Sequence, residues 1–192
     1  MFRRIGVPLL IILALISVYL GAYKPRIKST TYIETQSRLP TYRTLEQLVD
    51  NFDKALEYPS PVGQEEVVKF SLSQFEKMIL NQDQSETASV NLVHYIEQYI
   101  YEDNIVHLLQ TGNLYNTLYE RFKKQEYLET TENYYKKIRE IAPNIPHSLY
   151  RLFTLYKRSG QYDKMKETGQ KILELWPEDS KVKNELKTLE NE

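Results

Sequence analysis

Apolar side chains recur with a fixed offset of 34 positions across residues 112–179. The first copy carries Tyr115, Leu118, Phe122, Leu128, Tyr135, Ile138 and Pro143, and the second carries Leu149, Leu152, Tyr156, Tyr162, Gly169, Ile172 and Pro177. Within each copy the apolar positions are spaced so that they share one face of each of two helices. A proline, which cannot continue a helix, closes each copy. The pattern therefore predicts two consecutive helix pairs.

A 34-residue repeat of paired helices is the signature of the tetratricopeptide repeat, or TPR. We predict an all-α fold, in which one N-terminal transmembrane helix precedes an α-α superhelix of TPR-like helix hairpins. The first TPR covers residues 112–145 and the second covers residues 146–179. Gly160 suits the tight turn of the second repeat, whereas Glu126 stands at that place in the first. Gly169 replaces a large ring and should allow a neighbouring helix to approach closely.

Helical patterns also flank the two repeats. Residues 42–111 are predicted to be a divergent, TPR-like helical region, with helices at residues 45–56, 64–80 and 89–101 and a further one that begins at 105 and enters the first TPR. Thr44 and Asn104 are the expected N-caps of two of these helices. Residues 180–192 are predicted to be a capping helix, with Lys181, Lys183, Glu185 and Lys187 facing water.

The N-terminal segment predicts a membrane anchor. Residues 5–23 carry no charge, and as a helix they rise roughly 28 Å, close to the thickness of a bilayer core. Tyr19 and Tyr23 lie where an interfacial aromatic belt would form. We predict that residues 1–23 form a cytoplasmic N-terminus and a single transmembrane helix. The alternative is a cleaved signal peptide ending at Ala22, although Leu20 fits such a cleavage site poorly.

Residues 24–41 are polar and are predicted to form an extended linker or stalk. Arg3 and Arg4 favour a cytoplasmic N-terminus, whereas the cations Lys24, Arg26 and Lys28 on the other flank favour the opposite orientation. We expect the TPR body to lie outside the cytoplasm. The three linker cations either contact anionic lipid headgroups or simply flank the membrane helix.

The composition limits the chemistry of the chain. A formal net charge of −1 gives no reason to expect a nucleic-acid partner. The absence of cysteine excludes disulfides, thiolate catalysis and cysteine zinc sites. His94, His107 and His147 lack the spacing of a helical metal site, and no phosphate-binding loop or nucleophile motif occurs. We therefore predict no enzymatic activity, no cofactor and no metal. The 16 tyrosines suit helix packing, with buried rings and hydroxyls that reach water.

Stacked TPR hairpins form a concave surface lined mainly by the first helix of each pair. By that geometry, the candidate partner-binding residues are Asn113, Asn116, Glu120, Lys123 and Lys124 in the first repeat, and His147, Tyr150, Arg151, Thr154, Lys157 and Arg158 in the second. The set is polar with a basic rim, which favours a protein or peptide partner of acidic or carboxylate character. The alternative is that the four lysine and arginine side chains near the helix ends are only solvated there, helped by the helix macrodipole.

Three short motifs add a resemblance to a larger family. They are Gly-Ala-Tyr-Lys-Pro at residues 21–25, Asn-Phe-Asp-Lys-Ala-Leu at 51–56 and Ser-Pro-Val-Gly-Gln-Glu at 60–65. With the two repeats behind them, they resemble the region after the last membrane helices of bacterial O-antigen ligase-related proteins that carry C-terminal TPRs. The resemblance implies a setting in the transfer or polymerisation of lipid-linked surface glycans. Nothing in the chain matches the active site of that family, so the resemblance assigns no catalytic residue.

The predicted function is that of a membrane-anchored TPR module that binds a protein partner, as an accessory of bacterial surface-polysaccharide assembly in the inner membrane. Two alternatives remain open. The chain is a fragment of an O-antigen ligase-like or polymerase-like glycan transferase without its catalytic part, or it is a secreted soluble TPR protein.

Overall fold

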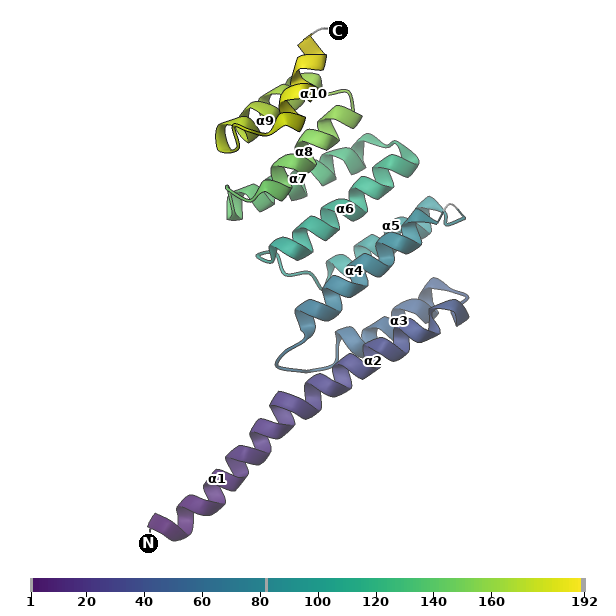
Figure 1. The fold of residues 1–192 in the computed structure, drawn as a ribbon. Helices are drawn as coiled ribbons and strands as arrows, with labels where there is room; N and C mark the ends of the chain where they lie inside the picture. The colour runs from purple at the N-terminus through teal and green to yellow at the C-terminus, as the bar shows by residue number, and fades with distance from the viewer. Residues whose placement is uncertain (1, 82, 191–192) are drawn as a thin grey trace. The chain divides into compact units, whose positions relative to one another are not determined.

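The computed structural model describes the backbone of residues 2–81 and 83–190, and the side chains of residues 7–81 and 83–189. All regular structure in these ranges is helical, as predicted (Figure 1). In chain order the elements are α1 (Phe2–Val18), the π-helical turn η1 (Tyr19–Tyr23), α2 (Lys24–Arg38), the 3-10 turn η2 (Leu39–Thr41), α3 (Leu45–Leu56), α4 (Gln64–Leu80), α5 (Glu86–Glu97), α6 (Ile105–Phe122), α7 (Gln125–Ile141), α8 (Pro146–Arg158), α9 (Tyr162–Leu175) and α10 (Ser180–Glu190).

The chain divides into two compact units. Unit 1 comprises Met1–Gln74 and His94–Ile100, and unit 2 comprises Phe75–Val93 and Tyr101–Glu192. Helices α4 and α5 contribute to both units.

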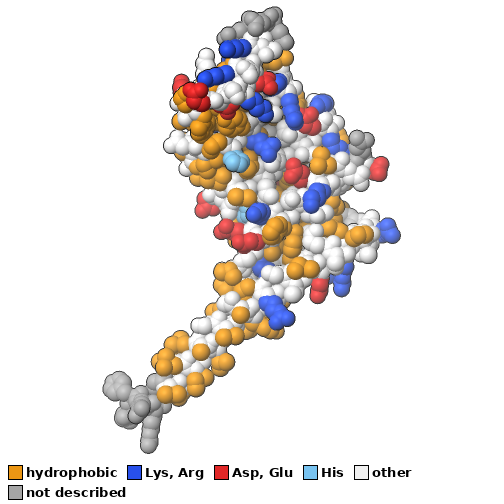
Figure 2. All heavy atoms as spheres, in the orientation of Figure 1, with side chains coloured by type: hydrophobic (Ala, Val, Ile, Leu, Met, Phe, Trp, Pro, Cys, Tyr) orange, Lys and Arg blue, Asp and Glu red, His pale blue; other side chains and the backbone are white. Residues whose placement is uncertain are grey.

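The N-terminal elements of unit 1 form one long helix over Val7–Thr41. Its most apolar stretch has a mean hydropathy of 2.0, and none of that stretch is buried. In Figure 2 orange apolar side chains cover the described part of α1, and charged side chains begin beyond it. By length and composition this helix is able to cross a membrane, so that part of the prediction is confirmed. The side chains of Arg3 and Arg4, which entered the predicted orientation, lie outside the described residues.

Pro25 explains why the long helix widens at η1. A proline has no N–H, so it cannot donate to the carbonyl of Gly21, four residues earlier. Instead the N–H of Lys24 donates to the carbonyl of Tyr19, five residues earlier, which is the spacing of a π-helix. The rings of Tyr19 and Tyr23 stack with centroids 5.7 Å apart, and the Lys24 ammonium lies 5.6 Å from the Tyr19 centroid. Aromatic and cationic groups thus meet at the end of the apolar segment.

The prediction of an extended linker over residues 24–41 is wrong, because residues 24–38 form α2, which packs against α3. Lys28 is only 1% exposed, and its ammonium donates to the carbonyls of Tyr58 at 2.8 Å and Leu56 at 3.4 Å. Two turns later the hydroxyl of Thr35 donates to the carbonyl of Asn51 at 2.9 Å. Two of the polar side chains that suggest a linker in the sequence, Lys28 and Thr35, are therefore donors to the backbone of α3.

Lys28 acts as a cap for the C-terminus of α3. Leu56 is the last residue of that helix, and its carbonyl has no partner within the helix. A cation at this end also interacts favourably with the helix macrodipole. Burial lowers the pKa of Lys28, which is the cost of placing an ammonium here. Of the two roles predicted for the linker cations, Lys28 fills neither, because its side chain is inside the protein.

Tyrosine hydroxyls also connect the helices of unit 1. The carboxylate of Asp53 in α3 accepts hydrogen bonds from Tyr95 at 2.6 Å and from Tyr99 at 2.8 Å. The two rings pack edge to face with centroids 5.6 Å apart. At the start of α3 the predicted cap is confirmed, because the Thr44 hydroxyl accepts from the N–H of Gln47. The tyrosine rings pack between helices as predicted, but their two hydroxyls bind a carboxylate, whereas the prediction was that tyrosine hydroxyls reach water.

In unit 2 the helices from α6 to α10 pack in chain order, each against the next (Figure 1). Their shared core includes Leu108, Leu128, Tyr135, Ile138, Leu149, Leu152, Tyr156, Met165, Ile172 and Val182, most of which are the recurring apolar positions. Asn104 caps α6 as predicted, and α6 runs without interruption into residue 122. Ser85 begins α5 three residues earlier than predicted, because its hydroxyl accepts from the N–H of Ala88.

The two repeats turn at different places. In the second, Gly160 adopts a left-handed backbone with φ of +71°, as the sequence predicts. In the first, Lys123 takes the left-handed position with φ of 54°, and α7 begins at Gln125. Glu126 therefore lies in the first turn of α7 and not in the connection. Without a glycine at residue 126 the chain turns three residues earlier relative to the repeat.

Gly169 permits the close approach that the sequence predicts. A β-carbon at this position would lie 2.9 Å from a ring carbon of Phe153 in α8 and 3.0 Å from the methyl groups of Leu186 in α10. Such distances are shorter than side-chain contacts allow, so one of the neighbours would have to shift. Gly169 thus lets α9 approach both the helix before it and the helix after it.

We expect Lys28→Met to destabilise unit 1 by about 1–3 kcal/mol, because it leaves the buried carbonyls of Leu56 and Tyr58 without a donor. Far-UV circular dichroism during urea unfolding of the full chain in detergent micelles measures this. Lys54→Met on the exposed side of α3 is the control and should change stability by less than about 0.5 kcal/mol. Equal effects of the two substitutions would contradict the capping role.

We expect Gly169→Ala to destabilise unit 2 by about 1–3 kcal/mol, because overpacking outweighs the gain of about 1 kcal/mol in helix propensity. Trp176 is the only tryptophan of the chain and packs against the core of unit 2, so its fluorescence follows the unfolding of this unit alone. Gln170→Ala on the exposed side of α9 is the matched control. A stabilised Gly169→Ala variant would show that Phe153 and Leu186 move aside at little cost.

Candidate binding face

The predicted binding residues lie on α6 and α8 and at their C-terminal ends, and we call this set the first-helix face. The exposed sides of the two helices meet through ion pairs. Glu120 of α6 lies 3.4 Å from the guanidinium of Arg158 of α8 and 3.0 Å from the ammonium of Lys123. Arg158 and Lys123 are thus placed on either side of one carboxylate, and the basic ends of both repeats are brought together.

Two further residues of the first repeat have other partners. Asn113 is half-buried, and its side-chain oxygen accepts a hydrogen bond from the Tyr135 hydroxyl at 2.8 Å. Lys124 forms an ion pair with Glu86 of α5 at 2.6 Å, and Glu86 also accepts from the Tyr127 hydroxyl. Lys124 is therefore held toward α5, apart from the cations on α8. Asn116 is half-buried on α6.

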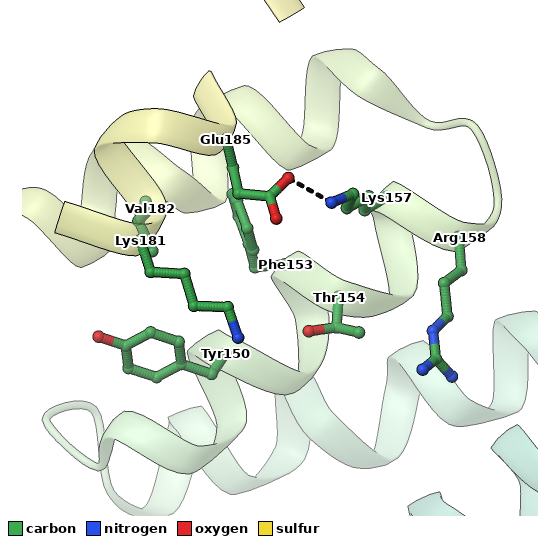
Figure 3. A pocket seen from close by; sticks show the side chains of 8 residues that line it. All are labelled: Tyr150, Phe153, Thr154, Lys157, Arg158, Lys181, Val182 and Glu185. Carbon is green, nitrogen blue, oxygen red and sulfur yellow. Dashed lines mark hydrogen bonds and ion pairs between the residues drawn. The ribbon is translucent and has the colours of Figure 1, made fainter. Parts of the chain in front are cut away.

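The residues of the second repeat come together in a hollow between α8 and α10 (Figure 3). We call it the α8–α10 hollow. Its volume is about 370 Å³, and its lining consists of Tyr150, Phe153, Thr154, Lys157, Arg158, Lys181, Val182 and Glu185. Phe153 and Val182 are buried and form an apolar floor. Four of the predicted binding residues of the second repeat line this hollow.

Cations predominate on the walls of the α8–α10 hollow. Lys157 pairs with Glu185 and Arg158 with Glu120, while Lys181 extends from α10 across the hollow toward α8 (Figure 3). The lining therefore carries three cations and one anion. The pairs with Lys157 and Arg158 are exposed, and exposed ion pairs are weak enough for an incoming anion to compete with them. Chemically, the hollow can accept an anionic group beside an apolar one.

Tyr150 has a structural role in addition to lining the hollow. Its hydroxyl donates to the carboxylate of Asp179, which also accepts from the N–H of Val182 and so caps α10. The hydrogen bond to Asp179 raises the pKa of Tyr150 to about 12, and the same bond lowers the pKa of Asp179. The Tyr150 ring also lies 6.0 Å from the ring of Trp176. Tyr150 therefore positions α10, the opposite wall of the hollow.

A second, shallower hollow of about 400 Å³ lies along α8, lined by Pro146, His147, Tyr150, Arg151 and Thr154. The charge of Arg151 also affects the pKa of a carboxylate in α4. Burial raises the pKa of Glu76, and the charge of Arg151 opposes that rise. The predicted residues His147, Arg151 and Thr154 are thus brought together beside the α8–α10 hollow.

Sequence reasoning missed four lining residues, Lys181, Glu185, Phe153 and Val182. The first two were assigned to the water-facing side of a capping helix, and Phe153 and Val182 were not counted with the binding residues. The 34-residue offset could have identified two of them. Lys181 lies 34 positions after His147, and Glu185 lies 34 positions after Arg151. Helix α10 therefore corresponds to α8 by the 34-residue offset, and both helices line the α8–α10 hollow.

The described residues contain no group of three or more histidine, cysteine, aspartate or glutamate side chains that could hold a metal ion. His107 is buried, its ring stacks on Tyr101, and its Nδ1 accepts from the Tyr101 N–H at 3.2 Å. His94 and His147 are exposed.

No known family model matches this chain, and no curated protein is similar enough to be recognised as its relative.

Proposed function

We propose that this chain is a membrane-anchored TPR module whose first-helix face, continued by α10, binds a peptide segment of a protein partner. The observation that carries the proposal is the α8–α10 hollow, with three cations around an apolar floor. Four of the five α8 residues that line it were candidates from the repeat pattern, and the 34-residue period extends to α10. The ligand that fits is an acidic side chain or a carboxylate next to an apolar side chain.

The arrangement of α6 to α10 supports this assignment. Consecutive helices pack in order, the recurring apolar positions form the core, and Gly169 allows close approach, as expected of stacked TPR hairpins. Peptide recognition by such surfaces requires side chains fixed by their neighbours. Here Tyr150 is held by Asp179 and Trp176, and Glu120 is held by two cations.

The proposed setting is the bacterial inner membrane, with the TPR body outside the cytoplasm, as an accessory of surface-polysaccharide assembly. The long apolar helix supports the anchor. The stacked Tyr19 and Tyr23 beside Lys24 suit a membrane interface at its end. The link to polysaccharide assembly rests on the three short motifs at residues 21–25, 51–56 and 60–65.

Cysteine labelling tests the topology. The chain has no cysteine, so Ser180→Cys at the exposed start of α10 provides a single reactive thiol. We expect a membrane-impermeant maleimide to label this variant in intact spheroplasts, on an uncleaved chain that sediments with the membranes. Labelling only after lysis would place the body in the cytoplasm. A shortened, labelled chain in the medium would instead establish the secreted form.

Peptide display tests the binding face. Random peptides displayed on phage are selected on the purified full chain in detergent micelles, and we expect enrichment of sequences with an acidic residue near an apolar one. Lys181→Glu should weaken the selected peptides by about tenfold, since a hydrogen bond to a charged group contributes about 1.5 kcal/mol. Thr154→Trp should block the hollow without unfolding the protein, because Thr154 is exposed.

Two exposed positions of α9 serve as matched controls. Gln170→Trp adds the same bulk and Lys166→Glu reverses the same charge away from the hollow, and both should leave peptide binding unchanged. If the unaltered chain selects no peptides beyond those retained by Thr154→Trp, the α8–α10 hollow is not a peptide site.

A further inference from the structure

An apolar groove lies in unit 1 between α2 and α4, beside the proposed membrane anchor. Its lining is Ser29, Tyr32 and Ile33 from α2, Val62 and Gly63 from the connection before α4, and Glu66, Val67 and Phe70 from α4. The groove has a volume of about 520 Å³. Ile33 is 64% exposed, Val62 57% and Phe70 50%. Large apolar side chains gathered around one opening, rather than scattered, indicate an interaction surface.

The groove has a firm base that does not depend on an occupant. The ring of Tyr32 stacks on Phe70 with centroids 6.3 Å apart and meets Phe52 edge to face, also at 6.3 Å. The Tyr32 hydroxyl accepts from the side-chain amide of Gln36 at 2.9 Å. Val67 is buried beneath the opening. An apolar side chain that enters the groove therefore meets a preformed surface.

The exposed face of α2 next to this groove has the composition of a helix-packing surface. Arg26, Ser29, Thr30, Ile33 and Ser37 follow one another at helical spacing and are all exposed. Lys28 and Thr35 lie on the opposite side of the same helix and bind α3. Around Ile33 this face carries the small residues Ser29, Thr30 and Ser37, which lets another helix approach closely.

The charged residues at the groove indicate which ligand would fit it. Glu66 lines the groove and is exposed, and Arg26 is exposed one helical turn below Ser29. In the described part of the chain neither Glu66 nor Arg26 forms an ion pair. A ligand for this groove needs an apolar side chain and a cation that reaches Glu66. The outer face of α2 itself has this pattern, with Ile33 above Arg26.

We propose that two copies of this chain associate in parallel through this groove, each placing Ile33 in the groove of the other and Arg26 against Glu66 of the other. The parallel orientation rests on the proposed anchor, because two chains that cross one membrane in the same direction present α2 at the same height. A two-fold axis along the membrane normal makes the contacts reciprocal. Confinement to the membrane raises the effective concentration of the second copy.

Cysteine cross-linking in native membranes tests the interface, since the chain has no cysteine of its own. Disulfides form only when β-carbons approach within about 4.5 Å. Under a mild oxidant Ile33→Cys should give covalent dimers in several-fold higher yield than Glu34→Cys. Glu34 is also exposed but lies about 100° around the helix from Ile33. Equal yields from the two variants, or cross-links only to other proteins, would overturn the proposal.

Charge exchange supplies a second, independent test. Arg26→Glu and Glu66→Arg should each lower the Ile33→Cys dimer yield several-fold, whereas the combined variant should restore it, because exchanged charges pair again between identical chains. Failure of the combined variant to recover would exclude the Arg26–Glu66 contact between copies. Neither a lipid tail nor an unrelated partner in the groove would produce such a recovery.

Membrane flotation of the same samples separates this proposal from the proposed anchor. Protein that floats with the vesicles but gives no Ile33→Cys dimer disproves the self-association alone. Protein that remains in the soluble fraction disproves the anchor and, with it, the parallel arrangement.

Discussion

A buried lysine ammonium is the interaction on which the membrane-proximal half of the molecule depends. Lys28 projects from a helix continuous with the apolar segment and donates to the carbonyls at the end of α3. Few single side chains can satisfy two orphan carbonyls and favour a helix dipole at once. The contact holds α2 in helical form against α3, and the face of α2 that carries Arg26 and Ile33 is consequently turned outward. The groove between α2 and α4 follows from this orientation.

Unit 2 depends on a different constraint, the distance at which neighbouring helices pack. Gly169 has no side chain, so Phe153 and Leu186 approach α9 from both sides. Helix α10 therefore closes on α8, and Lys181 reaches the same hollow as Thr154 and Arg158. Tyr150 and Asp179 secure this closure, since one hydrogen bond joins the two helices and caps α10 at the same time. The α8–α10 hollow is thus a consequence of how the helices around it pack.

The two proposals have a joint consequence for binding strength. A parallel dimer places two first-helix faces on one patch of membrane, and a partner with two copies of its acidic segment would bind both. Linked binding events of this kind raise the overall affinity without any new contact. Weak contacts between the partner and a single face are then sufficient, because release of the partner from one face does not release it from the other.

The sequence alone determined the all-helical fold, the apolar helix, the caps Thr44 and Asn104, the turn at Gly160 and the need for space at Gly169. These features are local, or they repeat at a fixed period, so spacing reveals them. Only the tertiary structure decided that residues 24–38 are helical, because Lys28 and Thr35 find acceptors on α3, far along the chain. It also decided that Lys123 makes the first turn, that Lys124 is held by Glu86, and that Lys181 and Glu185 line the hollow. Each of these features depends on which backbone group or charge from a distant part of the sequence lies nearby in space. The spacing of residues along the sequence does not give that spatial distance.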